Sequence, residues 1–367
     1  MFTVFFSQKL SSLAALLIRL QQNDPNPNPF EPETVLVQSV GMAQWLQMQI
    51  ADQTGVAAHY QFPFPTSFLW QQYRVLFPEL PKENIFERES VTWRLMRLIP
   101  NYLGQAEFES LNLYLNKDAR QYQLKLYQLA GKIADLFDQY LVYRPHWLVH
   151  WESHQIEAVL NEILSAIVFN EKNEQDILAN LRWQAALWNA LIEDIKADSD
   201  EKVFMTSHRA YLQQQYFDKL DNLTESEQAK LPKRIFVFGI SSLPATQLAV
   251  LKKLSEHCDI YLFFLDPSRE YWADSVEDKT LEKLALKQQL SPQDLEALLA
   301  EQGNQLLTMW GKQGREFLAQ LVEQEPDNTI EVFDEYEGDS NLIKLKNAIL
   351  NFNNEQQFVL ANEDKSI

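Results

Sequence analysis

The residues around Gly41 occupy the place where a nucleotide-binding protein keeps its phosphate loop. Such a loop has the pattern G-x-x-x-x-G-K-[ST], whose backbone N–H groups and lysine hold the phosphates and whose hydroxyl holds magnesium. With Gly41 aligned to the last glycine, Met42 takes the lysine position and Ala43 the hydroxyl position. The first glycine position holds Leu36. This degenerate nucleotide site therefore lacks each group that neutralises or coordinates phosphate.

A second motif of nucleotide hydrolysis is an acidic pair at the end of a buried strand, which positions magnesium and water. The candidate strand at 234–239 is followed by Ile240, Ser241 and Ser242, with no carboxylate. The Gly-Lys pairs at 131–132 and 311–312 have no glycine five residues earlier. Two independent losses predict that the chain does not hydrolyse ATP.

Other catalytic chemistry finds little support. His146, His150 and His154 are spaced at i, i+4 and i+8, but Pro145 and neighbouring tryptophans favour a packing or surface role. The sequence contains no nucleophile elbow and no carboxylate set with nuclease spacing. We expect no catalytic residues and no metal site.

The composition indicates a folded protein of a reducing compartment. The 367 residues are 46% hydrophobic and 12% aromatic, and Cys258 is the single cysteine. We see no signal peptide and no apolar run long enough for a membrane helix, so we expect a cytoplasmic protein. The net charge of −19 argues against a simple basic module that coats DNA. It leaves room for an internal DNA channel with locally placed arginines.

The elements that must position the Gly41 loop begin at the N-terminus. Apolar patterns predict a strand at 2–6, a helix at 8–22 and a strand at 34–38. A tight turn at Ser39–Gly41 leads into a helix that starts near Met42. Strand, tight loop and helix form the opening unit of an α/β nucleotide-binding fold.

The middle of the chain has a different pattern. Apolar residues at steps of three or four predict a long helix at 119–143, with an earlier helix around 93–99 and a later one around 178–191. Strand patterns are scarce over this stretch. It reads as an all-helical insertion.

The α/β pattern then returns, with strands at 234–239 and 260–265 on either side of a helix at 244–257. Further elements are predicted as helices near 280–287, 292–301 and 303–323, a strand at 329–333 and a helix at 340–352, with a polar, frayed stretch at 354–367. The fold class is therefore α/β, with the first and last parts of the core closing into one sheet.

This layout matches an inactivated superfamily-1 helicase-like (P-loop NTPase-like) core with a large all-helical insertion. The expected domains are a 1A-like core of 1–80 plus 226–350, a 1B-like insertion of 81–225, and a polar tail or linker to absent C-terminal domains at 351–367. Many unrelated α/β proteins also carry helical insertions. From pattern alone, the Gly41 turn could equally be an ordinary strand-to-helix connection.

Long strings of the sequence are more specific than its pattern. Residues 37–48 (VQSVGMAQWLQM) and 134–145 (ADLFDQYLVYRP) resemble signatures of the RecC family, the gamma subunits of exodeoxyribonuclease V, or RecBCD. Shorter matches occur at 29–33, 62–65, 238–241, 243–244 and 310–312. The resemblance runs in order through most of the chain.

The resemblance implies a helicase-like subunit whose motor sites have decayed, within an ATP-dependent DNA helicase and exonuclease. RecC-type subunits lie between RecB and RecD, on which ATP and magnesium act, so no cofactor is expected in this chain. They bind single-stranded and forked double-stranded DNA in double-strand-break repair by recombination. They channel the 3′ strand and recognise the Chi sequence. Family members are longer, so this chain corresponds to their N-terminal part.

The family's Chi-reading surface maps onto matched positions of this sequence. Two of them depart from the family pattern, because Val40 replaces a hydroxyl residue and Phe64 an aliphatic one. Glutamine and arginine can address base edges or phosphate, and aromatic rings can stack on bases. The implied DNA- and Chi-binding residues are Gln38, Val40, Gln44, Phe64, Trp70, Asp135, Leu136, Asp138, Gln139, Arg144 and Arg209.

The same residues also have ordinary structural readings. Phe64 and Trp70 could be core aromatics, Asp135 and Asp138 could form a solvated helix face, and Arg144 could interact with helix carbonyls. Competing functions are an active ATP-dependent helicase, the related AddB-type nuclease subunit, and a protein–protein scaffold without DNA readout. The losses at the Gly41 loop disfavour the active helicase, and the wording GMAQWL favours RecC over AddB.

Overall fold

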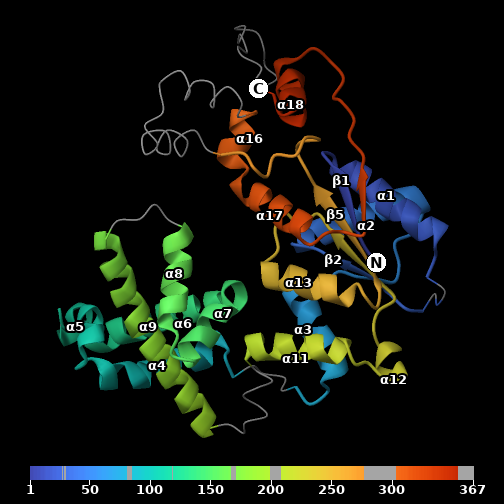
Figure 1. The fold of residues 1–367 in the computed structure, drawn as a ribbon. Helices are drawn as coiled ribbons and strands as arrows, with labels where there is room; N and C mark the ends of the chain where they lie inside the picture. Colours follow the sequence, from blue (N-terminus) through green and yellow to red (C-terminus); the bar gives the residue numbers. More distant parts are fainter. Residues whose placement is uncertain are drawn as a thin grey trace. The chain divides into compact units, whose positions relative to one another are not determined.

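A computed structural model describes the chain except for residues 27, 29, 81–84, 118, 167–170, 199–207, 277–302 and 354–367. It divides into two units, each traced in Figure 1: unit 1 is Met1–Gln72 with Glu225–Ile367, and unit 2 is Tyr73–Thr224. The helices predicted at 280–287 and 292–301 and the tail at 354–367 lie outside the described residues. That unit 1 is a 1A-like core and unit 2 a 1B-like insertion stays a prediction.

Unit 1 contains a parallel sheet. Among the described residues its strand order is β3-β2-β4-β5-β1-β6. The strands are β1 (Phe2–Ser7), β2 (Glu33–Leu36), β3 (Tyr60–Gln61), β4 (Arg234–Phe238), β5 (Asp259–Leu265) and β6 (Asn328–Glu331). Parallel pairing of β1 with β5 and of β2 with β4 joins strands from the two ends of the unit. The prediction that early and late strands close into one sheet is confirmed.

The strands β1, β4 and β5 are largely buried and apolar on both faces because helices cover both sides of the sheet, as is usual for parallel sheets. Every residue of β1 is buried, and Phe5 stacks on Phe263 with ring centroids 4.8 Å apart. Helices α1 (Leu10–Asn23) and α2 (Val40–Thr54) pack on the Phe5 face. On the opposite face, Phe264 contacts Phe317 of α17 (Lys312–Glu323).

The helix predicted at 303–323 is interrupted. It consists of α16 (Gln305–Trp310) and α17, which are separated at Gly311. The N–H of Gly311 closes α16 on the carbonyl of Leu307 at 2.8 Å, and a Cβ at this position would lie 2.8 Å from the Trp272 ring. A larger residue at the break would therefore collide with Leu307 and Trp272. The remaining helices of this part are α12 (Glu225–Gln228), α13 (Ala245–Leu254) and α18 (Asn341–Leu350), and α3 (Pro65–Leu76) spans the boundary between the units.

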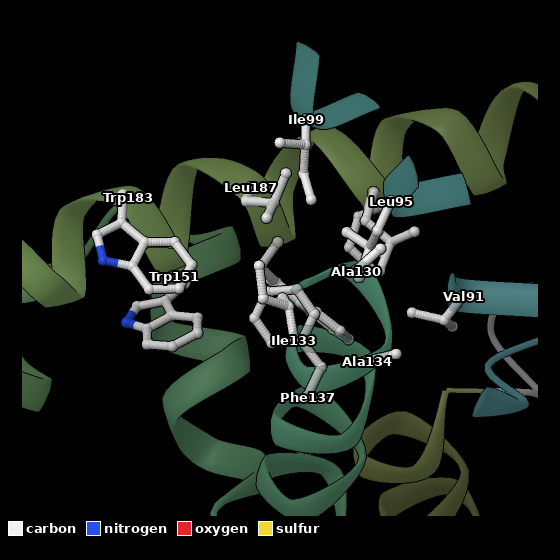
Figure 2. Packing of buried hydrophobic residues seen from close by; sticks show 14 of the residues in the cluster. Val91, Leu95, Ile99, Ala130, Ile133, Ala134, Phe137, Trp151, Trp183 and Leu187 are labelled. Atoms are coloured by element: carbon white, nitrogen blue, oxygen red, sulfur yellow. The ribbon is translucent and has the colours of Figure 1, made fainter. Parts of the chain in front are cut away.

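Unit 2 is helical throughout its described residues. Its α-helices are α4 (Arg88–Tyr102), α5 (Glu109–Asn116), α6 (Tyr122–Tyr143), α7 (Pro145–Glu152), α8 (Ile156–Ala166), α9 (Glu171–Asp198) and α11 (Arg209–Leu220), with short 3-10 turns at Ala106–Phe108 and Ala119–Gln121. Figure 2 shows Val91, Leu95 and Ile99 of α4 beside Ala130 and Ile133 of α6 in the shared core. The apolar stripe read from 119–143 is the buried face of α6.

Among the described residues, no helix is both long and apolar enough to span a membrane.

Candidate nucleic-acid interface

The Gly41 loop lies at the carboxyl edge of the sheet, where β2 and β4 run side by side. Gln38, the second residue after β2, accepts hydrogen bonds through Oε1 from the Ser241 hydroxyl at 3.2 Å and from its N–H at 3.4 Å. Ser241 belongs to the turn after β4. The two turns that would surround a nucleotide in a P-loop protein are thus bonded directly to each other.

The first turn of α2 is already capped. The hydroxyl of Ser39 accepts the N–H of Met42 at 3.1 Å, as an N-cap serine does. A phosphate at a helix N-terminus needs such free N–H groups. At least one of them is therefore occupied by the chain itself.

Met42 fills the space beside the turn after β4. Its thioether packs so closely on Gly239 that a Cβ there would lie 2.9 Å from Met42 Cε. Gly239 has a φ of +62°, in the left-handed region that glycine adopts without strain. Met42 and Ala43 both pack against the core of unit 1. An apolar side chain thus stands where the lysine of a phosphate loop would be.

The outer face of α2 carries two of the predicted DNA-binding residues. Val40, Gln44 and Met48 follow at steps of four, which places them on one face of the helix. All three are exposed, Val40 by 62%. This stripe begins beside Gln38 and offers one amide side chain between two apolar ones.

The segment before α3 lies next to this stripe. The N–H of Val37 donates to the carbonyl of Pro63 at 3.3 Å, which holds the Phe62–Phe64 segment beside the end of β2. Phe64 is 44% exposed, and Trp70 is half-buried within α3. The exposed ring of Phe64 could stack on a base. The ring of Trp70 is partly used in the packing of α3, and only the rest of it is accessible. Unit 1 thus brings Gln38 and the Phe64 segment to the same edge of the sheet.

The other predicted residues belong to unit 2, and α6 carries most of them. Asp135, Leu136 and Asp138 are half-buried, while Gln139 is exposed. Asp135 forms a two-point ion pair with Arg88 of α4, in which Arg88 Nη2 lies 3.2 Å from Oδ2. The hydrogen bond from Arg88 lowers the pKa of the Asp135 carboxyl. Asp135 is therefore a paired carboxylate, and its partner Arg88 was missed from the sequence.

Asp138 also has a cationic partner, and that partner is itself a predicted site residue. Arg209 Nη2 of α11 lies 3.2 Å from Asp138 Oδ1. Helices α6 and α11 are thereby joined by two residues of the candidate set. Their pairing places a donor and an acceptor side by side, as a base edge would require.

Arg144 is the most exposed cation of the set in unit 2. It follows α6, and its side chain, 53% exposed, lies 3.7 Å from Glu162 and 5.6 Å from the Trp147 ring centre. Burial opposes ionisation of Glu162, but hydrogen bonds from His146 and Trp147 outweigh it and lower the pKa of this carboxyl. Glu162 is thus bound at short range by His146 and Trp147, and its contact with Arg144 is the longer one.

A buried cluster fixes the start of α11, which carries Arg209. His208 is fully buried with Nε2 3.1 Å from Glu152, whose side chain is 10% exposed. Glu152 also accepts from Trp188 Nε1 at 2.9 Å and from the Tyr211 hydroxyl at 2.8 Å. Burial opposes ionisation of Glu152, yet the hydrogen bonds from His208, Trp188 and Tyr211 lower the pKa of its carboxyl. Burial and the hydrogen bond to Glu152 raise the pKa of the Tyr211 hydroxyl. Sequence reasoning missed this cluster, although His208 directly precedes Arg209.

The three histidines considered for metal do not converge. His146 contacts Glu162, His150 contacts Gln155, and His154 lies beyond the end of α7 with a φ of +57°. Within the described part of the chain, no group of three or more potential metal ligands gathers.

The candidate residues therefore form two groups, one on each unit. Unit 1 contributes Gln38, Val40, Gln44, Phe64 and Trp70, and unit 2 contributes Asp135, Leu136, Asp138, Gln139, Arg144 and Arg209. Each group combines exposed amide or cationic side chains with apolar or aromatic surface. That chemistry fits contact with bases better than binding of a metal or a nucleotide phosphate.

Comparison with known proteins identifies the family. The family described as RecC, N-terminal domain, matches residues 2–352. The RecBCD enzyme subunit RecC of Haemophilus influenzae is 39% identical over 99% of this chain and 34% of its own length. The same subunit of Escherichia coli K12 is 37% identical over 96% of this chain and 31% of its own length.

A more distant relative has the same description: the RecBCD enzyme subunit RecC of Mycolicibacterium smegmatis is 27% identical over 86% of this chain. The chain spans about a third of the length of the two more similar relatives. With a match that covers nearly all of its residues, this chain belongs to the RecC family and corresponds to its N-terminal domain.

Proposed function

We propose that the chain is the N-terminal, non-catalytic part of a DNA-handling subunit in a RecBCD-type helicase–nuclease of the bacterial cytoplasm. In this role it works with RecB- and RecD-type partners in double-strand-break repair. It guides the 3′-terminated single strand away from the fork and reads the Chi sequence in it. ATP and magnesium act on the partner subunits.

The observation that carries this proposal is the family match, since identity of 37–39% extends over at least 96% of the chain. Both of these relatives are described as subunits of the RecBCD enzyme. Such identity over a whole domain supports the same partners and the same DNA substrates.

The edge of the sheet supports a helicase-like core that does not bind nucleotide. The packing of Met42 on Gly239 and the bond between Gln38 and Ser241 fill the space between the two turns. Neither turn presents a lysine or a carboxylate. A nucleotide would have to displace apolar packing and would gain no charge partner.

The exposed face of α2 supports contact with bases. Gln44 offers an amide that both donates and accepts, the pattern suited to a base edge. It lies between Val40 and Met48 on an exposed stripe that has no positive charge of its own. Such a stripe discriminates among bases and contributes little to charge-driven binding.

Gln44→Ala in the complete protein, assembled with its RecB- and RecD-type partners, tests this proposal. We expect unwinding to persist and the Chi-dependent change in DNA degradation to weaken about fivefold or more, since a good base contact is worth about 1–3 kcal/mol. Gln53→Ala, on an exposed residue near the end of α2, is the matched control. An unchanged Chi response in the Gln44 variant would instead favour a scaffold without DNA readout on this face.

A further inference from the structure

Unit 2 contains a pocket whose lining includes only one of the proposed DNA-reading residues. It has a volume of about 590 Å³ and is lined by residues of α4, α5 and α6, among them Arg88, Trp93, Tyr114, Tyr127, Gly131 and Asp135. This volume falls within the range of about 300–1,000 Å³ usual for small-molecule sites. Asp135 is the one member that the family resemblance assigns to DNA.

Two aromatic rings at this pocket are exposed. Trp93 of α4 is 56% exposed and Tyr127 of α6 is 47% exposed, with ring centres 5.6 Å apart. Other residues of α4, such as Val91 and Leu95, belong to the buried core of the unit, where Figure 2 shows them. The rings are therefore not needed to fill the core. Exposed aromatic faces beside a pocket are suited to stacking on a flat, unsaturated ligand.

Cationic side chains accompany these rings. Arg88 and Lys132 line the pocket together with two carboxylates, Glu89 and Asp135. The ion pair with Arg88 neutralises Asp135, and Lys125 lies 5.8 Å from the ring centre of Tyr114. A ligand with a flat ring and an attached anion would find partners for both parts. Carboxylate oxygens at the same pocket can accept from exocyclic amino groups.

Gly131 is unusual within the long helix α6. A glycine in a helix interior is less stable than alanine by about 0.5–1 kcal/mol. No neighbour requires it, since an added Cβ would meet Arg88 Nη2 at 3.9 Å and Thr92 Cγ2 at 4.0 Å, which are ordinary contacts. Tyr127, Gly131 and Asp135 follow at steps of four on one face of α6. The missing side chain leaves open space between the aromatic and the carboxylate parts of the pocket.

We propose that this pocket holds one unpaired base of a DNA strand, stacked against Trp93 and Tyr127, with the neighbouring phosphate beside Lys132. The inference rests on the proposed DNA-handling function and adds a stacking site to it. A helical peptide is the less suitable occupant, because the exposed leucines nearby, Leu113 and Leu124, are not among the residues that line the pocket.

Photo-crosslinking in the complete three-subunit enzyme tests the site. The probe is a forked duplex whose 3′ strand carries 5-iododeoxyuridine at successive positions, and crosslinked residues are mapped by mass spectrometry. We expect one position to crosslink to Trp93 or Tyr127. This crosslink should vanish in Gly131→Leu, whose side chain enters the pocket, and persist in Gly131→Ala.

Crosslinks near Gln38–Gln44 without any at Trp93 or Tyr127 would overturn the pocket proposal and leave the DNA-handling function standing. The absence of crosslinks at the pocket and at every candidate residue of both units would overturn both. Binding of the same fork by variants that keep the fold gives a second measurement. We expect Trp93→Leu to weaken it about tenfold and Trp93→Phe to keep most of it, because only an aromatic ring stacks. If Trp93→Leu binds normally and Leu124→Ala does not, the surface is an apolar docking face and the proposal is wrong.

Discussion

At the scale of single residues, the packing of Met42 on Gly239 supports the proposal that this edge of the sheet does not bind nucleotide. Met42 stands at the position that aligns with the lysine of a phosphate loop, and its thioether lies against the backbone of the neighbouring turn. Gly239 makes this possible in two ways, since it adopts a φ of +62° and has no Cβ to meet the methionine. The two residues act as one structural element.

Gly239→Ala tests this pair. We expect a loss of about 1–2 kcal/mol in the free energy of unfolding, because an L-residue is strained at this φ and its Cβ contacts Met42. Urea denaturation provides the measurement. In a double-mutant cycle, Met42→Ala should remove the contact part of the loss and leave the backbone part.

Gly41→Ala is the control for that experiment, because a Cβ at Gly41 meets nothing closer than Ser39 Oγ at 3.9 Å. We expect its stability to be unchanged or slightly higher. Equal losses at Gly41 and Gly239 would show that the contact with Met42 has no special role.

A second prediction at this scale concerns Asp266, which is buried at the end of β5. It accepts from Trp272 Nε1 at 2.9 Å and from the Ser268 N–H at 3.2 Å, but burial dominates and raises its pKa to about 7. The folded protein therefore binds this proton more tightly than the unfolded chain does. Stability from this group is complete below about pH 4 and is lost as the pH rises toward 7, at up to about 1.4 kcal/mol per pH unit.

Asp266→Asn keeps the accepting oxygen and removes the charge. The variant should be more stable than the parent at pH 8, with the difference shrinking to nothing as the pH falls to 4. Thermal unfolding across this range measures the difference, and Asp339→Asn, on an exposed residue, serves as the comparison. A difference that does not change with pH would contradict the assignment.

At the scale of elements, the joint between α7 and α11 determines where Arg209 lies. Glu152 at the end of α7 receives donors from Trp188, Tyr211 and the buried His208, and α11 begins at the next residue after His208. Arg209 then pairs with Asp138 of α6. The position of Arg209 and Asp138 thus depends on contacts of Glu152, which is not itself one of the candidate residues.

Glu152→Gln should destabilise unit 2 by about 1–3 kcal/mol, because the amide nitrogen of glutamine cannot accept a hydrogen bond and one of the buried donors Trp188 and Tyr211 would lose its acceptor. Chemical denaturation followed by tryptophan fluorescence measures the loss. Glu157→Gln, an exposed neighbour on α8, should change stability by less than about 0.5 kcal/mol. Similar behaviour of the two variants would show that the cluster does not hold α11.

The elements also show which parts of the fold can be predicted from the sequence. Strong patterns predicted β1, β4, β5 and the long helix α6, because their apolar residues repeat with the period of the element. The two-residue strand β3 was missed, since Tyr60–Gln61 is too short to have a period. The break at Gly311 was missed, and the close approach of Trp272 to this glycine joins residues that are remote in sequence and leaves no local pattern.

The candidate site residues were likewise predictable, whereas their contacts with residues distant in sequence were not. The family resemblance supplied the set that includes Gln44 and Arg144, and the structure places both at exposed positions. It could not supply their partners, such as Arg88 for Asp135, because an ion pair across 47 residues leaves no local signal. The stacking surface of Trp93 and Tyr127 escaped for the same reason, since the two residues approach only when α4 packs on α6.

At the scale of the whole molecule, the candidate residues are divided between an α/β unit and a helical unit. The chain has a net charge of −19, which argues against DNA binding driven by the overall charge of the chain. Recognition of a DNA sequence would then depend on a few placed cations, amides and aromatic rings. We propose that the helical unit reads sequence and does not merely support the assembly.

The measurement that tests this claim most directly is the Chi response of the complete three-subunit enzyme carrying Arg144→Ala, recorded together with its unwinding rate. Arg182→Ala, on an exposed arginine of α9 in the same unit, is the matched control. We expect the Arg144 variant to unwind DNA at the parent rate and to lose most of the Chi-dependent change in degradation, while the control retains both. A full Chi response with normal unwinding in the Arg144 variant would show that this residue does not read sequence.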